Sequence, residues 1–287
     1  MSRKGMLMKL TAKKAELLLM LVISARATSF MFSKLCLTTM DTFSLLALRF
    51  LFAAALLFLF FHRRICQGFS GKTLLSGILI GVLFFSVLTC ELIGLKTTDS
   101  STASFLENLA IIIVPLLESV ISRRRPERKA LLSALFALIG VAFLTLSASG
   151  ISFSRGEGIL LVAAFLYAVS IIVTNRLSRH GDSFVMGFFQ VAAIGGLSLF
   201  ITLITGSLTF PATLAQYGMI GILSVVCTGF GFTLQPVAQS RLSAEKAGTL
   251  CALSPLVAGI MGVVFLKETV TPNMLLGDLL ILISLLL

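Results

Sequence analysis

Histidine is nearly absent from this chain of 287 residues, which contains only His62 and His180. Both fall in polar stretches between apolar runs, so no H-E-x-x-H motif and no serine–histidine pair lies within such a run. The five cysteines show no C-x-x-C spacing, and most of them are interpreted as small packing residues. A Walker loop is missing as well. We therefore expect no catalytic residue, no metal, no cofactor and no ATP-driven pumping by this chain alone.

Charge is also scarce, because charged residues make up 12% of the chain and hydrophobic residues 57%. Soluble domains carry about twice that charge, and the mean hydropathy is +1.05. A helix needs about 20 apolar residues to cross a bilayer, and the sequence predicts ten such spans. They are Leu17–Cys36, Thr42–Phe61, Leu74–Leu95, Ser101–Ile121, Ala130–Leu146, Ile159–Asn175, Phe184–Ile204, Tyr217–Ala238, Gly248–Leu266 and Asn273–Leu287.

Two of these runs have a second interpretation. The first follows a basic start, and Ala25-Arg26-Ala27 imitates a signal-peptide cleavage site. Cleavage there would remove half of the segment that matches Ile159–Asn175 in the repeat described below, so we favour a retained span. The last run is short, which indicates either a short span or one that is cut by the end of the chain.

The basic residues that produce the net charge of +11 are distributed asymmetrically. If the N-terminus is inside, 17 of the 23 lysines and arginines fall on the inner side, four on the outer side and two within spans. This positive-inside bias predicts a multi-pass protein of the inner cell membrane with both termini cytoplasmic. The lipid bilayer is thus the expected partner, and nucleic acid is not, because no basic stretch carries interleaved aromatic residues.

The chain repeats itself after about 140 residues. The matching pairs are Glu16 and Glu157, Arg49 and Gln190, Gly77 and Gly218, Gly81 and Gly221, and Pro115 and Pro255. A repeat of this length, built from membrane spans, is typical of carriers with two similar halves.

We expect the first repeat to cover residues 1–149 and the second to cover residues 150–287, joined by a small, polar stretch at 147–156. Five spans per repeat is an odd number, so the second repeat must enter the membrane from the opposite side. The predicted fold is an all-α membrane protein with ten transmembrane helices in two inverted five-helix repeats. Such repeats usually hold a substrate at their interface and alternate access around it. A duplicated scaffold without transport is the alternative.

Each half also carries small residues, a proline in an apolar helix and a charged turn, at Ala103–Arg128 and at Ser243–Glu268. With the L-x-x-x-R-F helix at Leu45–Phe50, this order resembles the drug/metabolite transporter superfamily, specifically its ten-helix EamA-like carriers. The W-G-x-x-F-x-x-x-K opening of that family corresponds to Arg26–Lys34, but Arg26-Ala27 replaces Trp-Gly, and the chain has no tryptophan. The resemblance implies a carrier, with export favoured, whose first span borders a central cavity.

Ionisable side chains within the spans are the main site candidates, because each costs about 2.5–3.5 kcal/mol at a helix centre. They are Arg26, Arg49, Glu91, Glu107 and Asp278. At about 1.5 Å per residue, Arg49 and Glu107 lie about 9–12 Å deep, Arg26 about 15 Å and Glu91 about 6 Å. The first four can therefore share the outer half of one cavity, whereas Asp278 is assigned to packing or to a homodimer contact.

An arginine in such a cavity can hold a substrate carboxylate or phosphate with two parallel hydrogen bonds. Glu91 and Glu107 are the candidates for proton coupling, because a carboxyl group in an apolar environment can take up and release a proton. The alternative is that Arg26 or Arg49 forms an ion pair with Glu91 or Glu107 and only locks helices together.

Neutral polar residues extend this set with Ser29, Asn108, Tyr167, Gln190 and Gln235. Tyr167 is the repeat mate of Arg26, and Gln190 is the mate of Arg49, as expected for side chains that face a shared axis. Hydrogen bonds between helices, worth about 0.6–2 kcal/mol each, are the alternative.

These observations predict a secondary transporter that moves a small metabolite, such as an amino acid or a related organic anion, outward by alternating access at the repeat interface. The predicted substrate-binding residues are Arg26, Arg49, Glu107, Asn108, Tyr167 and Gln190. An intramembrane enzyme, a lipid scramblase and a membrane scaffold remain the alternatives.

Overall fold

The structure is a computed structural model that describes residues 11–98, 103, 106–123, 128–145, 155–254, 256–257 and 272–286. Every element in these ranges is a helix. In the first half they are α1 (Ala12–Ala27), α2 (Ser29–Cys36), α3 (Thr42–Gly68), α4 (Gly71–Leu95), α6 (Ala110–Ile121) and α7 (Arg128–Thr145). In the second half they are α8 (Arg155–Leu177), α9 (Ser183–Thr205), α10 (Leu214–Ile222), the π-helix η1 (Leu223–Phe232), α11 (Thr233–Gln239), α12 (Ala244–Leu250) and α14 (Pro272–Leu286).

These helices follow the ten predicted spans. Within the described part of the chain, six helical segments are long and apolar enough to cross a membrane: 12–36, 42–68, 71–95, 155–177, 183–205 and 214–239. The other four spans correspond to α6, α7, α12 and α14, which adjoin stretches outside the described residues. Pro255 and most of the predicted linker at 147–156 also lie outside those residues.

Polar side chains fix where many of the helices begin. A helix leaves its first backbone N–H groups without intrahelical partners, and a preceding hydroxyl or carboxylate can accept their hydrogen bonds. Asp41 accepts from the backbone N–H of Phe43 at 2.9 Å, and Asp182 accepts from that of Phe184 at 3.0 Å. Thr11, Ser70, Thr213 and Ser243 cap their helices in the same way.

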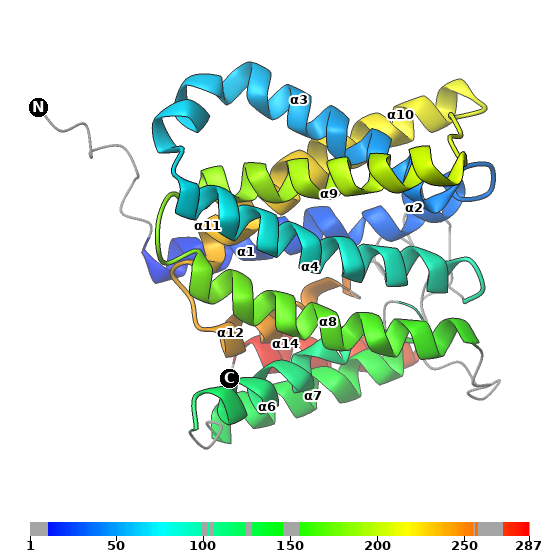
Figure 1. Cartoon of the computed structure of the whole chain (residues 1–287). Coiled ribbons are helices and arrows are strands. Elements are labelled where there is room, and N and C mark those ends of the chain that lie inside the picture. The colour runs from blue at the N-terminus through cyan, green and yellow to red at the C-terminus, as the bar shows by residue number, and fades with distance from the viewer. Residues whose placement is uncertain are drawn as a thin grey trace, which may run out of the picture.

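The two halves run in opposite directions through the bundle (Figure 1). The helices lie roughly along one axis, with α1 running from left to right and its repeat mate α8 from right to left. The pair α3 and α9 is likewise antiparallel, and the two helices pack together. The predicted fold class is confirmed: the chain is an all-helical membrane protein with two inverted five-helix repeats.

Glycines let α4 and α9 approach each other closely. A Cβ atom at Gly77 would lie 2.8 Å from the backbone oxygen of Met186, and one at Gly81 would lie 2.9 Å from that of Gln190. Small residues of this kind allow the dispersion contacts on which helix association in lipid depends. The α4–α9 contact thus joins the first repeat firmly to the second.

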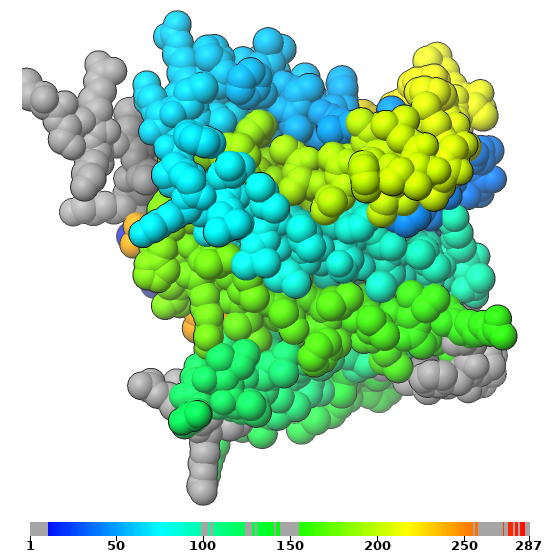
Figure 2. Space-filling model, viewed as in Figure 1, coloured from blue at the N-terminus to red at the C-terminus, as the bar shows by residue number. Residues whose placement is uncertain are grey.

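Large apolar side chains cover much of the outer surface. Figure 2 shows α4, α8 and α9 side by side on one face of the molecule. Among the side chains exposed by more than half are Leu59, Phe60, Leu75, Phe200, Leu203 and Ile204. A helical bundle with so much exposed apolar surface is suited to a hydrocarbon environment.

Two local irregularities interrupt the spans near the middle of the bundle. The first span is divided at Thr28, which separates α1 from α2 and donates its hydroxyl hydrogen bond to the backbone oxygen of Ala25 at 2.8 Å. The span from 214 to 239 contains η1, a π-helix of 10 residues. Wide turns of this type are frequent at functional sites, and neither irregularity was predicted from the sequence.

Candidate functional site

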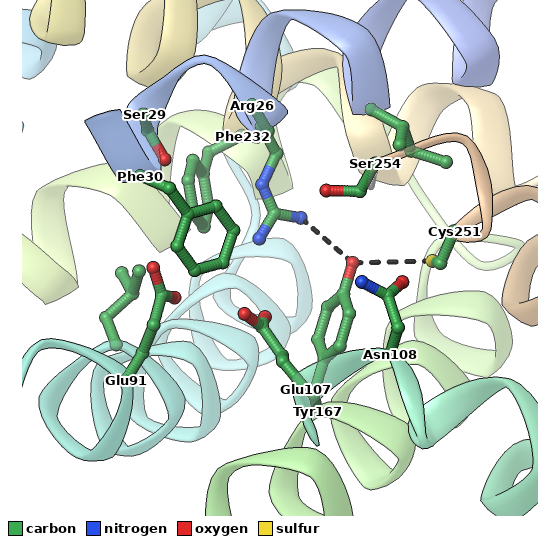
Figure 3. A pocket seen from close by; sticks show the side chains of 12 residues that line it. Arg26, Ser29, Phe30, Glu91, Glu107, Asn108, Tyr167, Phe232, Cys251 and Ser254 are labelled. Atoms are coloured by element: carbon green, nitrogen blue, oxygen red, sulfur yellow. Dashed lines mark hydrogen bonds between the residues drawn. The ribbon is translucent and has the colours of Figure 1, made fainter. Parts of the chain in front are cut away.

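A buried chamber lies where the break between α1 and α2 faces α4, α8 and the end of η1 (Figure 3). Both repeats contribute to its wall. The lining residues are Ile23, Arg26, Ser29, Phe30, Leu88, Glu91, Glu107, Asn108, Tyr167, Phe232, Cys251 and Ser254. Its free volume is about 30 Å³, which admits water but no metabolite.

Arg26 enters the chamber from the last turn of α1. Its Nη1 atom donates to the side-chain oxygen of Gln235 at 2.7 Å and to the hydroxyl of Tyr167 at 3.5 Å. The Cζ atom lies 4.2 Å from the ring centre of Phe232, 5.4 Å from that of Phe84 and 5.5 Å from that of Tyr167. Aromatic faces attract a guanidinium and shield it from water. The positive charge is therefore held in place while one edge of the group remains toward the cavity.

Gly231 makes room for this arginine. A Cβ atom at Gly231 would lie 2.8 Å from Cγ of Arg26. The π-helix thus presents a gap at Gly231 and an aromatic ring at Phe232 to the same side chain. The course of η1 therefore positions Arg26 directly.

Glu91 on α4 and Glu107, which precedes α6, are the two acidic residues of the chamber. They are 4% and 6% exposed, and both carboxyl groups point toward the space occupied by the Arg26 guanidinium (Figure 3). Among the described residues, neither forms an ion pair with Arg26, and Oε2 of Glu107 has no hydrogen-bond partner. The helix-locking ion pair that the sequence left open is not formed. Because unsatisfied buried polar atoms are costly, this arrangement suits a ligand or proton that satisfies them.

Tyr167 connects the two repeats at this point. Its hydroxyl accepts from Arg26, its repeat mate, and also lies 3.4 Å from Sγ of Cys251. Asn108 and Ser29 line the same chamber. Five of the residues singled out in the sequence as binding or proton-coupling candidates, Arg26, Glu91, Glu107, Asn108 and Tyr167, are therefore brought together.

Arg49 is close to the chamber but does not line it. It is 1% exposed, and its Nε atom donates to the hydroxyl of Thr228 on η1 at 2.6 Å. Its Cζ atom lies 5.9 Å from the ring centre of Phe232, so this ring is shared with Arg26. Within the part of the chain that the structure describes, Nη2 of Arg49 is buried without a partner.

Gln190 also lies outside the chamber. It is fully buried on α9, beside the close contact with Gly81, and neither atom of its amide has a hydrogen-bond partner among the described residues. The structure does not describe the side chain of Asp278. A substrate role for Arg49 or Gln190 stays a prediction.

Phe232, Cys251 and Ser254 line the chamber but were not singled out in the sequence. Phe232 is one of 24 phenylalanines, and nothing in its local pattern distinguishes it. Gln235 was singled out in the sequence as a polar residue in an apolar span, and in the structure its side-chain oxygen accepts a hydrogen bond from Arg26. No group of three or more metal-ligating side chains occurs in the described ranges.

Comparison with known proteins agrees with this architecture. The sequence model of the EamA-like transporter family matches twice, over residues 13–146 and 154–287. An uncharacterized transporter of Archaeoglobus fulgidus is 27% identical over 276 residues, covering 94% of this chain and 84% of the relative. The threonine/homoserine exporter RhtA of Escherichia coli is 27% identical over 169 residues, which cover 57% of this chain and 55% of RhtA.

A solved crystal structure of 18% sequence identity has the same fold, with a TM-score of 0.77 over 96% of this chain and 94% of the other. The two matches to the family model cover most of the sequence, one in each half. The family is one of membrane transporters and not of enzymes. The chain therefore belongs to the EamA-like transporter family, within the drug/metabolite transporter superfamily, and is a multi-pass membrane transporter of a small molecule.

Proposed function

We propose that this transporter exports an amino acid or a closely related organic anion. The observation that carries the proposal is the chamber itself, in which Arg26 faces Glu91 and Glu107 without an ion pair between them. Both signs of charge are thus present and available in one enclosed space.

A zwitterion is the ligand that matches this arrangement. The guanidinium of Arg26 suits a carboxylate, because its planar fork can donate two parallel hydrogen bonds. The carboxylates of Glu91 and Glu107 suit an ammonium group. Relationship to a threonine/homoserine exporter supports the same substrate class, and it also supports movement out of the cell.

The carboxyl groups also supply a route to proton coupling. In the absence of substrate, a proton bound to Glu107 or Glu91 reduces the cost of burying two carboxylates in one chamber. Entry of an ammonium group makes the ionised form favourable again. Substrate and proton would then occupy the same acidic pair in turn, which is the requirement for exchange.

In the sequence, we place the boundary between the repeats between residues 149 and 150. Alternating access would take place where the two repeats contact each other in the bundle. Support comes from the bond between Arg26 and Tyr167, since each half of the chain supplies one partner. The free volume of the chamber, about 30 Å³, is too small for a metabolite, so substrate entry would require the halves to separate. The break at Thr28 and the π-helix are suited to absorb that movement.

Purified protein in liposomes tests the proposal. Vesicles loaded with unlabelled threonine or homoserine are expected to accumulate the labelled compound by counterflow, and an imposed pH gradient should change the rate. Protein-free vesicles and vesicles loaded with a sugar are the controls. Equal uptake in all vesicles, with every amino acid in a panel of twenty, would refute the proposed substrate class.

A further inference from the structure

A second hollow, unrelated to the chamber, opens on the side of the bundle. It has a volume of about 300 Å³ and lies between α3, the start of α9, η1 and α11. Its wall is formed largely by apolar side chains, including Leu56, Phe60, Phe61, Phe184, Val225 and Phe230. The hydroxyl of Ser224 also lines it but donates to the backbone oxygen of Ile220 at 2.7 Å. We call this hollow the lateral crevice.

The lateral crevice faces the hydrocarbon of the bilayer. Phe60 is 73% exposed, Val225 51% and Phe61 44%, as expected for side chains that contact lipid. Water is not stable in a hollow that offers it no polar partners, and the surrounding medium is itself apolar. The occupant must therefore be an apolar chain from that medium.

One end of the lateral crevice has a positively charged rim. The backbone of α3 leaves helical geometry at Phe61, and the exposed side chains of His62 and Arg63 follow directly. The guanidinium of Arg64 lies over the ring of Phe184, with Cζ 4.3 Å from its centre. Because Phe184 lines the crevice, Arg64 lies next to it.

Among the described residues, one acidic side chain contacts Arg64, and it leaves this charge largely available. Asp182 lies 3.8 Å from Arg64 in a half-exposed ion pair. Its carboxylate already accepts the backbone N–H bonds of Phe184 and Val185 at the start of α9. An arginine that is 42% exposed and only loosely paired can still bind a phosphate.

We propose that the lateral crevice is a binding site for an anionic phospholipid. One acyl chain fills the space between α3, η1 and α11, and the headgroup phosphate lies against Arg64, with Arg63 adding charge. The leaflet is the one on the side of these two arginines. Basic residues next to a membrane-facing hollow are an arrangement that recognises anionic headgroups. This site is independent of the proposed substrate, because it shares no lining residue with the chamber.

Native mass spectrometry of the full chain in detergent, titrated with dioleoyl phosphatidylglycerol, tests the proposal. Dioleoyl phosphatidylcholine tests the headgroup, and glycerol 3-phosphate tests whether a free phosphate suffices. We expect phosphatidylglycerol to bind more tightly than phosphatidylcholine by about fivefold, and glycerol 3-phosphate not to bind. Arg64→Gln should remove most of this preference, since one basic residue near the headgroup contributes about that factor.

Filling the crevice tests the acyl-chain half of the proposal. Val225→Trp should raise the Kd for phosphatidylglycerol by about tenfold, because it displaces buried methylene groups of the lipid. Val162→Trp is the matched control, since Val162 is 52% exposed against 51% for Val225 but lies on α8, away from the crevice. Lys72→Gln, which removes an exposed basic residue at the start of α4, is the control for Arg64→Gln.

Each result decides the matter. Equal affinity for the two lipids, binding of glycerol 3-phosphate alone, or an unchanged Kd in Val225→Trp would overturn the proposal. If Val225→Trp fails to fold, Leu56→Trp fills the same crevice from α3, and the same criterion applies. An equal loss in Val162→Trp would show a general effect of tryptophan and would also overturn it.

Discussion

The charge of Arg26 is held in the chamber by hydrogen bonds to Gln235 and Tyr167 and by the rings of Tyr167, Phe84 and Phe232. Arg26→Lys keeps the charge but removes the planar fork, so a substrate carboxylate would keep only one hydrogen bond. We expect KM in the counterflow assay to rise roughly 10- to 100-fold, the cost of a lost bond to a charged group.

The matched control is Arg176→Lys, which changes an arginine that pairs with Glu118 at 2.9 Å, away from the chamber. Its transport should match that of the unchanged protein. If Arg26→Lys also transports with an unchanged KM, Arg26 does not bind substrate.

Glu107 is expected to control coupling rather than folding. Glu107→Gln removes the ionisable group but preserves the shape of the side chain, and Oε2 has no partner to lose in the described residues. We expect the imposed pH gradient to lose its effect on the transport rate, while counterflow persists with a raised KM because Glu91 still offers a carboxylate to the ammonium group. Glu118→Gln is the control on the following helix, because Glu118 pairs with Arg176. A variant at Glu107 that still responds fully to the gradient would exclude it as the coupling residue.

The sequence identifies which side chains are chemically unusual, but not which way they point. Arg26, Glu91, Glu107 and Tyr167 were predicted from their charge or polarity in apolar spans, and the chamber contains all four. Arg49 had a suitable depth as well. Depth fixes only one coordinate, whereas the rotation of the helix about its axis directs the Arg49 side chain to Thr228 instead. Phe232 was missed because a phenylalanine in an apolar span carries no signal of its own.

The contact between α4 and α9 should depend strongly on its glycines. At Gly77, an added methyl group would lie 2.8 Å from the backbone oxygen of Met186, which cannot move without shifting α9. We expect Gly77→Ala to lower the free energy of unfolding by about 1–3 kcal/mol, the usual cost of overpacking. Unfolding in detergent mixtures, followed by circular dichroism, measures this change.

Gly196→Ala is the control, because a Cβ atom at Gly196 on α9 would have no neighbour within 4 Å. It should leave stability unchanged or raise it slightly, since alanine favours a helix. Equal stability of Gly77→Ala and Gly196→Ala would mean that α4 and α9 are not closely packed in the membrane.

Helix positions were predictable because long apolar runs mark them in the sequence. The irregularities within the helices were not. A π-helix and an α-helix have similar apolar patterns over 10 residues, and they differ in backbone hydrogen bonds that depend on neighbouring helices. The sequence does not indicate the break at Thr28 either, because the hydroxyl of Thr28 donates to a backbone oxygen in a way that uninterrupted helices also allow.

At the scale of the whole molecule, two inverted repeats meet at a polar chamber. The charged side chains of the chamber, Arg26, Glu91 and Glu107, come from the first half of the chain, and the second half supplies Tyr167, Phe232, Cys251 and Ser254 around them. Separation of the halves therefore changes access and the surroundings of Arg26 in a single movement. The lateral crevice lies on the outer surface of the same bundle, where a bound lipid would contact Val225 and Phe230 of η1.

The last prediction concerns the orientation of the protein in the membrane. The positive-inside bias predicts cytoplasmic termini, and the odd number of helices per repeat predicts that the second repeat enters from the opposite side. Cys66 is exposed beside Arg63 and Arg64 at the end of α3, and Arg155 is exposed at the start of α8. α3 and α8 run in the same direction in Figure 1, so the end of one and the start of the other lie on opposite sides.

With cytoplasmic termini, a membrane-impermeant maleimide added to intact cells should label Arg155→Cys in a Cys66→Ser background. The protein with its natural Cys66 should be labelled only after the cells are opened. The reverse labelling pattern would place both termini outside the cell and would contradict the orientation that the positive-inside bias predicts.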